Sequence, residues 1–173
     1  MKIAVGVIVR DHFRTLYDKD AVTASVGEFS LFYGLPVIIA MLGYFQHFSL
    51  KPDGYNVSIT FFGIFIALLL NIQVAIFAIF QRKWDKPLDP IEVRTQERVI
   101  ATRRALLEEL NANISYLVLV CCVALTATVV FYIATWVTGA APAFTLFLYA
   151  HFLLTLLMIV RSSHALFQRE YRE

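Results

Sequence analysis

Few side chains in this sequence combine the residue types and spacings that catalysis or metal binding requires. There is no glycine-rich phosphate loop, no serine turn typical of hydrolases, no paired carboxylates and no zinc-ligand spacing. The only cysteines, Cys121 and Cys122, are adjacent, which suits neither an ordinary disulfide nor a metal site. We therefore expect no enzymatic activity, no cofactor and no metal ion.

The remaining candidates are polar side chains inside or at the edge of long apolar stretches, where unpaired polar groups are costly. They are Asn71, Gln73, His151 and Arg161. Asn71 and Gln73 point about 200° apart on a helix, so they cannot both line one narrow lumen in a monomer. We expect one of them to bond across a helix or subunit boundary. For Asn71, a packing hydrogen bond and a pore or gating role are both open.

Two roles are open for each of the other candidates. His151 could relay a proton or sense pH, or it could be a neutral packing residue, since no carboxylate accompanies it in its apolar stretch. Arg161 could mark the end of an apolar helix, with its guanidinium reaching the membrane surface. Alternatively it lies a turn inside, where a ring of arginines in an oligomer would favour anions.

The stretches that hold these residues are long enough to cross a membrane. Of 173 residues, 59% are hydrophobic and 16% are charged, whereas soluble domains average about 45–50% and about 25%. A membrane helix needs about 20 apolar residues. We predict spans at 29–48, 56–80, 115–138 and 142–160, the last extending in a longer version to 167. A turn at Gly139–Pro142 separates the last two.

The predicted fold is an all-α membrane protein with four transmembrane helices, arranged as two antiparallel hairpins because the connections at 49–55 and 139–142 are short. The predicted divisions are a cytoplasmic or interfacial segment (1–27), a first hairpin (28–80), a basic loop and helix (81–114), a second hairpin (115–167) and a tail (168–173). Within the first segment, Ile8–Tyr17 is expected to be an interfacial amphipathic piece. Pro36 should kink the first span.

Positive charges are distributed unequally between the two sides of these spans. Lys51 is the only one of the 15 Lys and Arg residues in the outer connections. The others precede the first span, lie between the second and third, or follow the fourth. By the positive-inside rule, both termini and the central segment are cytoplasmic.

A charged helix is predicted between spans two and three. Asp89–Glu92 is typical of a helix start, with Asp as the cap and Pro at the first helical position. Because no strong breaker follows Leu110, the helix can continue into the third span. Its candidate partner-docking residues are Val99, Leu106 and Leu110, which form an apolar stripe, and the arginines Arg94, Arg98 and Arg103.

The central arginines could bind acidic lipid, nucleic acid or an acidic protein surface. Membrane orientation alone already requires positive charge on this loop. We therefore expect contact with membrane lipid and no direct binding of nucleic acid.

Several short stretches resemble those of a group of small bacterial inner-membrane proteins. They are Asp11–Leu16, Phe32–Pro36, Leu68–Gln73, Leu106–Tyr116 and Leu153–Met158. Several proteins of this kind accompany phage defence genes, and the layout is similar to the Kiwa membrane component and to the membrane subunit of the Rex exclusion system. The resemblance implies a bacterial inner-membrane protein that forms a homo-oligomer and works with a soluble cytoplasmic protein in antiviral defence.

The function expected from these features is that of a membrane sensor or effector. Such an oligomer couples a cytoplasmic partner or signal to the membrane, with altered permeability as one output. A non-conducting anchor for a soluble effector is the main alternative. A small transporter is a further alternative, although the spans lack the broken helices and ionisable pairs that transported solutes usually need.

Overall fold

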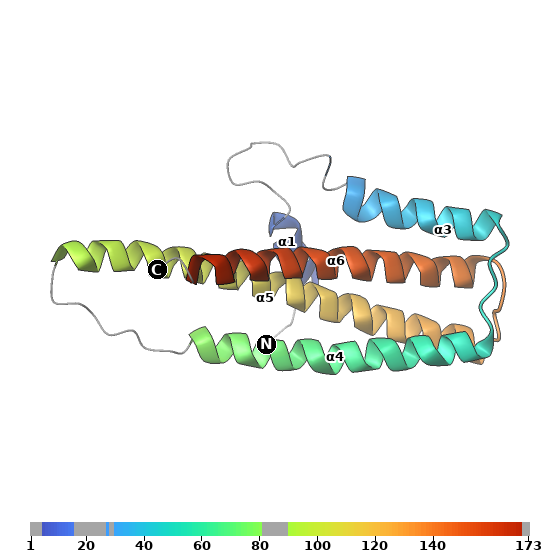
Figure 1. Cartoon of the computed structure of the whole chain (residues 1–173). Coiled ribbons are helices and arrows are strands. Elements are labelled where there is room, and N and C mark those ends of the chain that lie inside the picture. Colours follow the sequence, from blue (N-terminus) through green and yellow to red (C-terminus); the bar gives the residue numbers. More distant parts are fainter. Residues whose placement is uncertain (1–4, 16–26, 28–29, 81–89, 171–173) are drawn as a thin grey trace.

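The computed structural model describes residues 5–15, 27, 30–80 and 90–170 of the chain; within these, the side chains of 15, 80, 90–99, 165–167 and 169–170 are left out. The described residues form helices and short connections, with no strand (Figure 1), so the all-α prediction is confirmed. In chain order the elements are α1 (Val5–Thr15), a π-helical turn η1 (Ser30–Gly34), α3 (Leu35–Phe45), α4 (Pro52–Phe80), α5 (Pro90–Ile133) and α6 (Ala140–Glu170).

Three of these helices are long and apolar enough to cross a membrane. The candidate spans are Pro52–Ile79 in α4, Ile100–Ile133 in α5 and Ala140–His164 in α6. The apolar helical stretch Ser30–Phe45 is shorter than the predicted first span. At 1.5 Å per residue it covers about 24 Å, less than the roughly 30 Å hydrocarbon layer.

The α5 helix is the centre of the fold. It runs unbroken for 44 residues, which confirms the predicted continuation of the charged helix into the apolar stretch that follows it. It packs against α1, α4 and α6. Its buried side chains recur at alternating spacings of three and four residues, the pattern of a coiled-coil seam: Leu107, Leu110, Ile114, Leu117, Cys121, Ala124 and Thr128.

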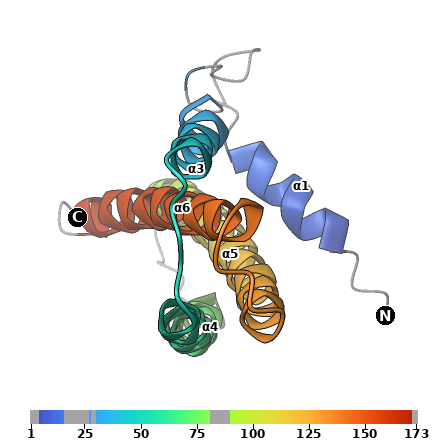
Figure 2. The same ribbon diagram turned by 90° about the vertical axis from the view of Figure 1, so that its right-hand side faces the viewer.

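The α3 helix packs against α6, and no contact joins it to α4 in the described part of the chain. Figure 2 shows α3 and α4 on opposite sides of α6, with the connection between them passing across α6. A hydrogen bond from Leu50 N to Val137 O (3.0 Å) holds this connection to the loop between α5 and α6. The first predicted hairpin is therefore antiparallel but not packed together, whereas α5 and α6 do pack as neighbours.

The helices α3 and α5 end in the same way. Phe48 N bonds Gly43 O (2.9 Å) and Trp136 N bonds Phe131 O (3.1 Å), each six-to-one bond enclosing a residue of positive φ. Those residues are His47 (φ 52°) and Thr135 (φ 54°). After α5 the chain turns over residues 134–139, so the turn predicted at 139–142 is placed slightly late, and Ala140 already begins α6.

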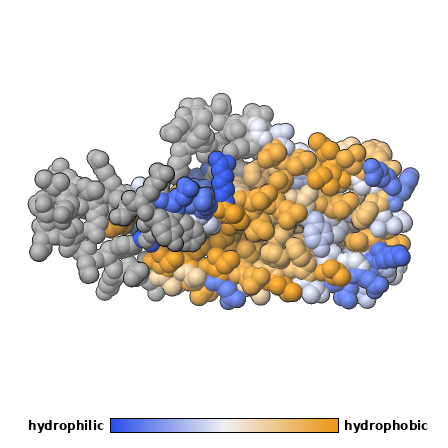
Figure 3. All heavy atoms as spheres, viewed as in Figure 1, coloured by the Kyte–Doolittle hydropathy of each residue, from blue (hydrophilic) through white to orange (hydrophobic). Residues whose placement is uncertain are grey.

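The α1 helix lies across the bundle. It is seen end-on in Figure 1, where the other helices run lengthwise, and lengthwise in Figure 2. On the face shown in Figure 3, hydrophobic side chains cover most of the part of the bundle that lies beside α3. The first apolar stretch changes from a π-helical turn, which ends at Gly34, to the α-helix α3, and Pro36 lies in the first turn of α3. The kink predicted at Pro36 stays a prediction.

Candidate functional site

Polar side chains from four elements meet in the interior where α1 crosses the bundle. We call His12 of α1, Tyr33 of η1, Asn113 and Tyr116 of α5, and His151 of α6 the polar cluster. His12, Asn113, Tyr116 and His151 are buried and Tyr33 is half-buried. Because their positions along the chain are so far apart, the cluster forms only when the whole fold is assembled.

His12 attaches α1 to α5. Its ring stacks on that of Tyr116, with centroids 3.8 Å apart and planes 3° from parallel. Its Nδ1–H donates to Asn113 Oδ1 at 2.9 Å. Asn113 and Tyr116 are three residues apart and therefore share one face of α5. Burial lowers the pKa of His12 to about 4; His151 lowers it further and the bond to Asn113 opposes the shift. His12 is therefore neutral at pH 7.

His151 joins α6 to η1 by a hydrogen bond to the Phe32 carbonyl, which Pro36 leaves without its usual helical donor. Proline has no N–H, so Pro36 cannot donate to the carbonyl of Phe32 four residues earlier, as an ordinary helical residue would. The Nδ1–H of His151 donates to that carbonyl instead, at 3.1 Å. In a neutral imidazole the other nitrogen is then an acceptor. The hydroxyl of Tyr116 lies 2.8 Å from His151 Nε2 and donates to it.

Tyr33 completes the chain of hydrogen bonds. Its hydroxyl lies 3.2 Å from that of Tyr116, and since Tyr116 has given its proton to His151, Tyr33 donates. The ring of Tyr33 also stacks on Phe13 of α1, with centroids 5.7 Å apart. Tyr116 thus contacts α1, η1 and α6 at once.

The chemistry of this cluster is that of a connector. It contains imidazole, phenol and amide groups, with no nucleophile and no carboxylate among its five members. Among the described residues, no three His, Cys, Asp or Glu side chains lie together as metal ligands. Its hydrogen bonds have defined directions, so the cluster fixes how α1, η1, α5 and α6 meet.

The predicted intramembrane residues lie in different surroundings. Gln73 Nε2–H donates to Ser115 Oγ of α5 at 2.7 Å, so it does bond across a helix boundary. Asn71 is exposed on α4. It lies on the side away from α5, because Leu69, Gln73 and Ile76 form the face that packs inward. Only His151 belongs to the polar cluster.

Arg161 is exposed near the charged end of the bundle. The hydroxyl of its neighbour Ser162 donates to Glu109 Oε1 at 3.4 Å. Glu109 precedes Ser115, the partner of Gln73, by six residues, or about 9 Å along α5. Arg161 therefore does not lie at the depth of Gln73, which favours the interpretation that it marks the end of the apolar part of α6.

The predicted partner-docking stripe is largely used inside the chain. Leu110 is buried in the same apolar cluster as Ile76 of α4 and Ile159 of α6, so its role as an exposed docking residue is corrected. Leu106 and Arg103 are half-buried. The side chains of the other three candidates, Val99, Arg94 and Arg98, lie outside the described residues.

Sequence reasoning did not select His12, Tyr33, Asn113 or Tyr116 as site residues. One signal was available: Asn113 and Tyr116 occupy one helix face just where the apolar part of α5 begins. A polar pair at that position predicts a partner at the membrane surface. Which partner it contacts depends on the position of α1, and no periodicity specifies that.

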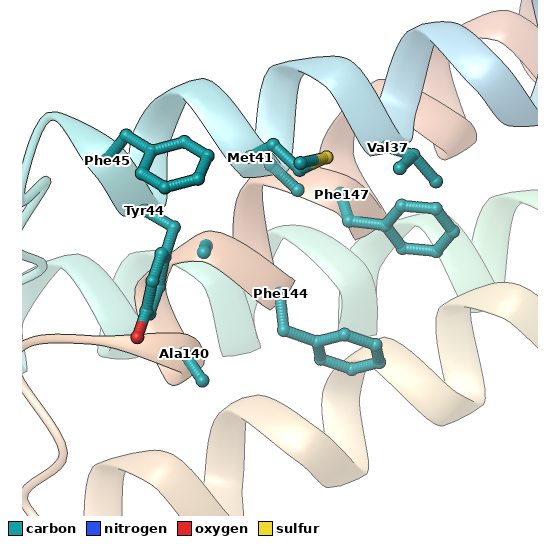
Figure 4. Close-up of a pocket in the computed structure, with 9 residues that line it drawn as sticks. Val37, Met41, Tyr44, Phe45, Ala140, Phe144 and Phe147 are labelled. Atoms are coloured by element: carbon teal, nitrogen blue, oxygen red, sulfur yellow. The ribbon is translucent and has the colours of Figure 1, made fainter.

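A recess of about 480 Å³ lies between α3 and α6. One of its lining residues, Phe147, stacks on His151 of the polar cluster with ring centroids 5.8 Å apart. Figure 4 shows its walls, which include Val37, Met41, Tyr44, Phe45, Ala140, Phe144 and Phe147. The side chains are aliphatic and aromatic, with the Tyr44 hydroxyl as their one polar group. The recess therefore lacks the converging polar groups that orient a specific ligand.

No protein-family model, no curated protein and no solved structure matches this chain.

Proposed function

We propose that this chain is a multi-pass protein of a bacterial inner membrane that couples a soluble cytoplasmic partner or signal to helices inside the membrane. In this proposal α3 to α6 are the four spans, and both termini and residues 81–89 are cytoplasmic. The concentration of Lys and Arg in those segments supports the orientation.

The position of α1 supports the same arrangement. Tyr116, on which His12 stacks, follows the charged Glu109 by seven residues, or about 10 Å along α5. That is the depth typical of a helix lying in the membrane surface, about 5–10 Å into the boundary region. Arg10 and Arg14 of α1 are exposed and suit contact with lipid phosphates. The short first span ends at the level of η1, beside α1.

The observation that carries the proposal is that α5 is one unbroken helix whose middle holds the polar cluster. Its first part extends to Pro90, next to the basic segment, and its last part is a span. A tilt or rotation of the first part must therefore displace Asn113 and Tyr116. Those two side chains hold α1 by His12 and connect to η1 and α6 by Tyr33 and His151.

A non-conducting anchor is the second candidate, and the bonding of the spans favours it over a pore through a single chain. Gln73, Tyr116, Tyr149, Thr128 and Thr155 all bond to other groups of the chain. Such bonds favour packing roles over roles in lining a lumen. An ion-flux assay in liposomes, with and without a cytoplasmic partner, separates the candidates: flux supports an effector that alters permeability, and its absence supports the anchor.

Coupling is tested by binding an antibody next to the first part of α5 and measuring the effect on α1. An antibody-binding epitope is inserted within residues 81–89, and hydrogen exchange of the α1 amides is followed in nanodiscs. Antibody binding should change exchange in Val5–Thr15. The variant Ala101→Pro, which interrupts α5 between the epitope and the cluster at a cost of about 3 kcal/mol, should abolish that change. Ala101 is exposed, so Ala101→Ser is the matched control and should behave as the parent.

An unchanged exchange pattern at α1 in the parent protein, with the antibody demonstrably bound, would rule out coupling through α5. An identical response in Ala101→Pro would show that the signal takes another route. The antiviral context is tested separately by comparing phage plating on cells with and without this protein and its neighbouring genes.

A further inference from the structure

Asn71 differs from the other polar side chains in the middle of the candidate spans. Gln73, Ser115, Tyr116, Thr126, Thr128, Tyr149, His151 and Thr155 each make a hydrogen bond within the chain. Asn71 makes none in the described part of the chain, and its side chain is exposed. Thr126 is also exposed, but its hydroxyl donates to the Cys122 carbonyl. Among these residues, Asn71 alone combines an exposed side chain with no hydrogen bond in the described part of the chain.

The depth of Asn71 makes this exposure costly. Gln73 bonds Ser115, so Asn71 lies beside the part of α5 near Leu117, well inside the apolar region. It precedes the end of the α4 span at Ile79 by eight residues, or about 12 Å. Lipid chains offer no hydrogen-bond partner, and a primary amide there requires another protein group.

The outer face of α4 is open to such a partner. Only 17% of the apolar window of α4 is buried within the chain, against 39% for α5 and for α6. Ala67 and Ala75, four residues before and after Asn71, are exposed on the same face. Small residues at this spacing let a second helix approach closely.

We propose that this face of α4 is the contact surface of a homo-oligomer in which Asn71 of one copy hydrogen-bonds Asn71 of a second copy. An amide carries both donors and acceptors, so it is complementary to itself across a two-fold axis. The candidate span Pro52–Ile79 has Asp53 as its one charged residue, at its outer end. Two copies of this face can therefore pack together without repulsion between like charges in the middle of the span. The inference rests on the membrane-spanning placement of α4 proposed above.

Cysteine cross-linking in membranes tests the surface. In a background with Cys121→Ala and Cys122→Ala, single cysteines are placed at Asn71, Ala67 or Ala75, and a short bifunctional maleimide is added to the full-length protein. These positions should give a product of twice the monomer mass. Leu70→Cys and Phe77→Cys are the matched controls: both residues are exposed, and they point about 100° and 120° away from Asn71. Their yield should be at least several-fold lower.

The amide itself is tested by dilution in detergent, with oligomer size measured by light scattering. Asn71→Leu should raise the dissociation constant about tenfold, as expected for the loss of one interhelical hydrogen bond in a membrane. Asn71→Gln keeps a donor and an acceptor and should retain most of the affinity. Because residue 71 faces outward, neither variant should disturb the monomer fold, which circular dichroism can verify.

Equal cross-linking at Leu70 and Phe77, a monomer at all concentrations, or a product containing a different protein in place of a second copy would each overturn the proposal. Carbonate extraction separates this failure from failure of the membrane placement. A protein that stays in the membrane but does not cross-link at residue 71 loses only the oligomer surface.

Discussion

His12 stands between two environments that favour different protonation states. Docked against α5, it is buried under the Tyr116 ring and donates to Asn113. Released with α1, it would meet water or lipid headgroups. Among the described residues, Asn113 and Tyr116 of α5 and His151 of α6 face it, and none of these three is anionic. Its own helix adds the exposed Arg10 and Arg14 and the half-exposed Asp11. Burial therefore disfavours a proton on the docked ring.

We therefore predict that α1 docking weakens as the pH falls. The pKa of His12 is about 4 when docked and about 6.5 when free. Between those values the undocked state binds more protons, so docking is fully stable above pH 6.5 and is lost progressively down to pH 4. The full effect is roughly 3 kcal/mol. Spin labels on Val7→Cys and Val123→Cys, in a Cys122→Ala background, should report a longer and broader distance distribution at low pH.

The matched control for this measurement is His12→Phe, which keeps an aromatic ring against Tyr116 but cannot take up a proton. Its docking should be weaker than that of the parent at pH 7, because Asn113 loses a donor. Its distance distribution should nevertheless change little between pH 7 and pH 4.5. A His12→Phe variant that opens over the same pH range as the parent would show that a different group controls α1.

Tyr116 has the largest number of connections in the polar cluster, so its hydroxyl should have a measurable effect on stability. The change Tyr116→Phe leaves His151 Nε2 buried without its donor and Tyr33 without its acceptor. The expected loss is about 1–3 kcal/mol, observed as a lower midpoint in sodium dodecyl sulfate titration. Tyr132→Phe removes a hydroxyl from an exposed tyrosine of the same helix and should change the midpoint little.

At the scale of whole elements, the predictions from sequence succeeded where one property decided the outcome. The two longest charge-free blocks gave long apolar helices, and the lack of a breaker after Leu110 is consistent with the continuity of α5. The shorter block that begins at residue 29 gave only the stretch Ser30–Phe45. The partner of α3 depends instead on shape. The side chain of Leu146 lies so close to Gly43 that a Cβ there would be 2.5 Å from its Cδ1, and such a fit between α3 and α6 has no signature in apolar periodicity.

The polar cluster could be predicted only in part for a related reason. His151 is conspicuous because a titratable group in an apolar stretch is rare. Tyr33 and Tyr116 are ordinary residues near the ends of apolar helices. Their roles depend on His151, whose Nδ1–H donates to the Phe32 carbonyl that Pro36 cannot bond. The missing N–H of Pro36 can be read from the sequence, whereas the residue that donates to the Phe32 carbonyl depends on the packing of α6.

The end of α5 carries strain that a single substitution should relieve. Thr135 is β-branched and has a φ of 54°, the left-handed region that costs such residues roughly 1–2 kcal/mol relative to glycine. Thr135→Gly keeps the six-to-one bond between Trp136 and Phe131 and should stabilise the protein by about 1 kcal/mol, measured by the same denaturant titration. Thr138→Gly, in the same loop without a positive φ, should be neutral or slightly destabilising. A destabilised Thr135→Gly would mean that the Thr135 side chain is needed for the turn.

At the scale of the whole molecule, the fold divides polar functions between its two ends. One end holds the short connections, closed by the bonds from Leu50 to Val137 and from Tyr55 Oη to the Trp136 carbonyl (2.7 Å). The other holds α1, the first part of α5 and, among the described basic side chains, Arg10, Arg14, Arg103, Arg104 and Arg161. This arrangement suits a protein that makes its contacts on one side of the membrane, because only one of its two ends has much surface outside the apolar helices.

The orientation itself is the last prediction, and it can be measured in intact cells. In a background with Cys121→Ala and Cys122→Ala, a membrane-impermeant maleimide should label His47→Cys, in the exposed connection after α3, without cell lysis. It should label Lys86→Cys only after the membrane is opened. Lys51 is the one Lys or Arg residue near His47, whereas many Lys and Arg residues lie near Lys86 in the sequence. By the positive-inside rule, this asymmetry strongly favours a cytoplasmic position for residue 86. Labelling of residue 86 in intact cells would reverse the orientation and move α1 and the first part of α5 to the outer side, where a soluble cytoplasmic partner could not reach them.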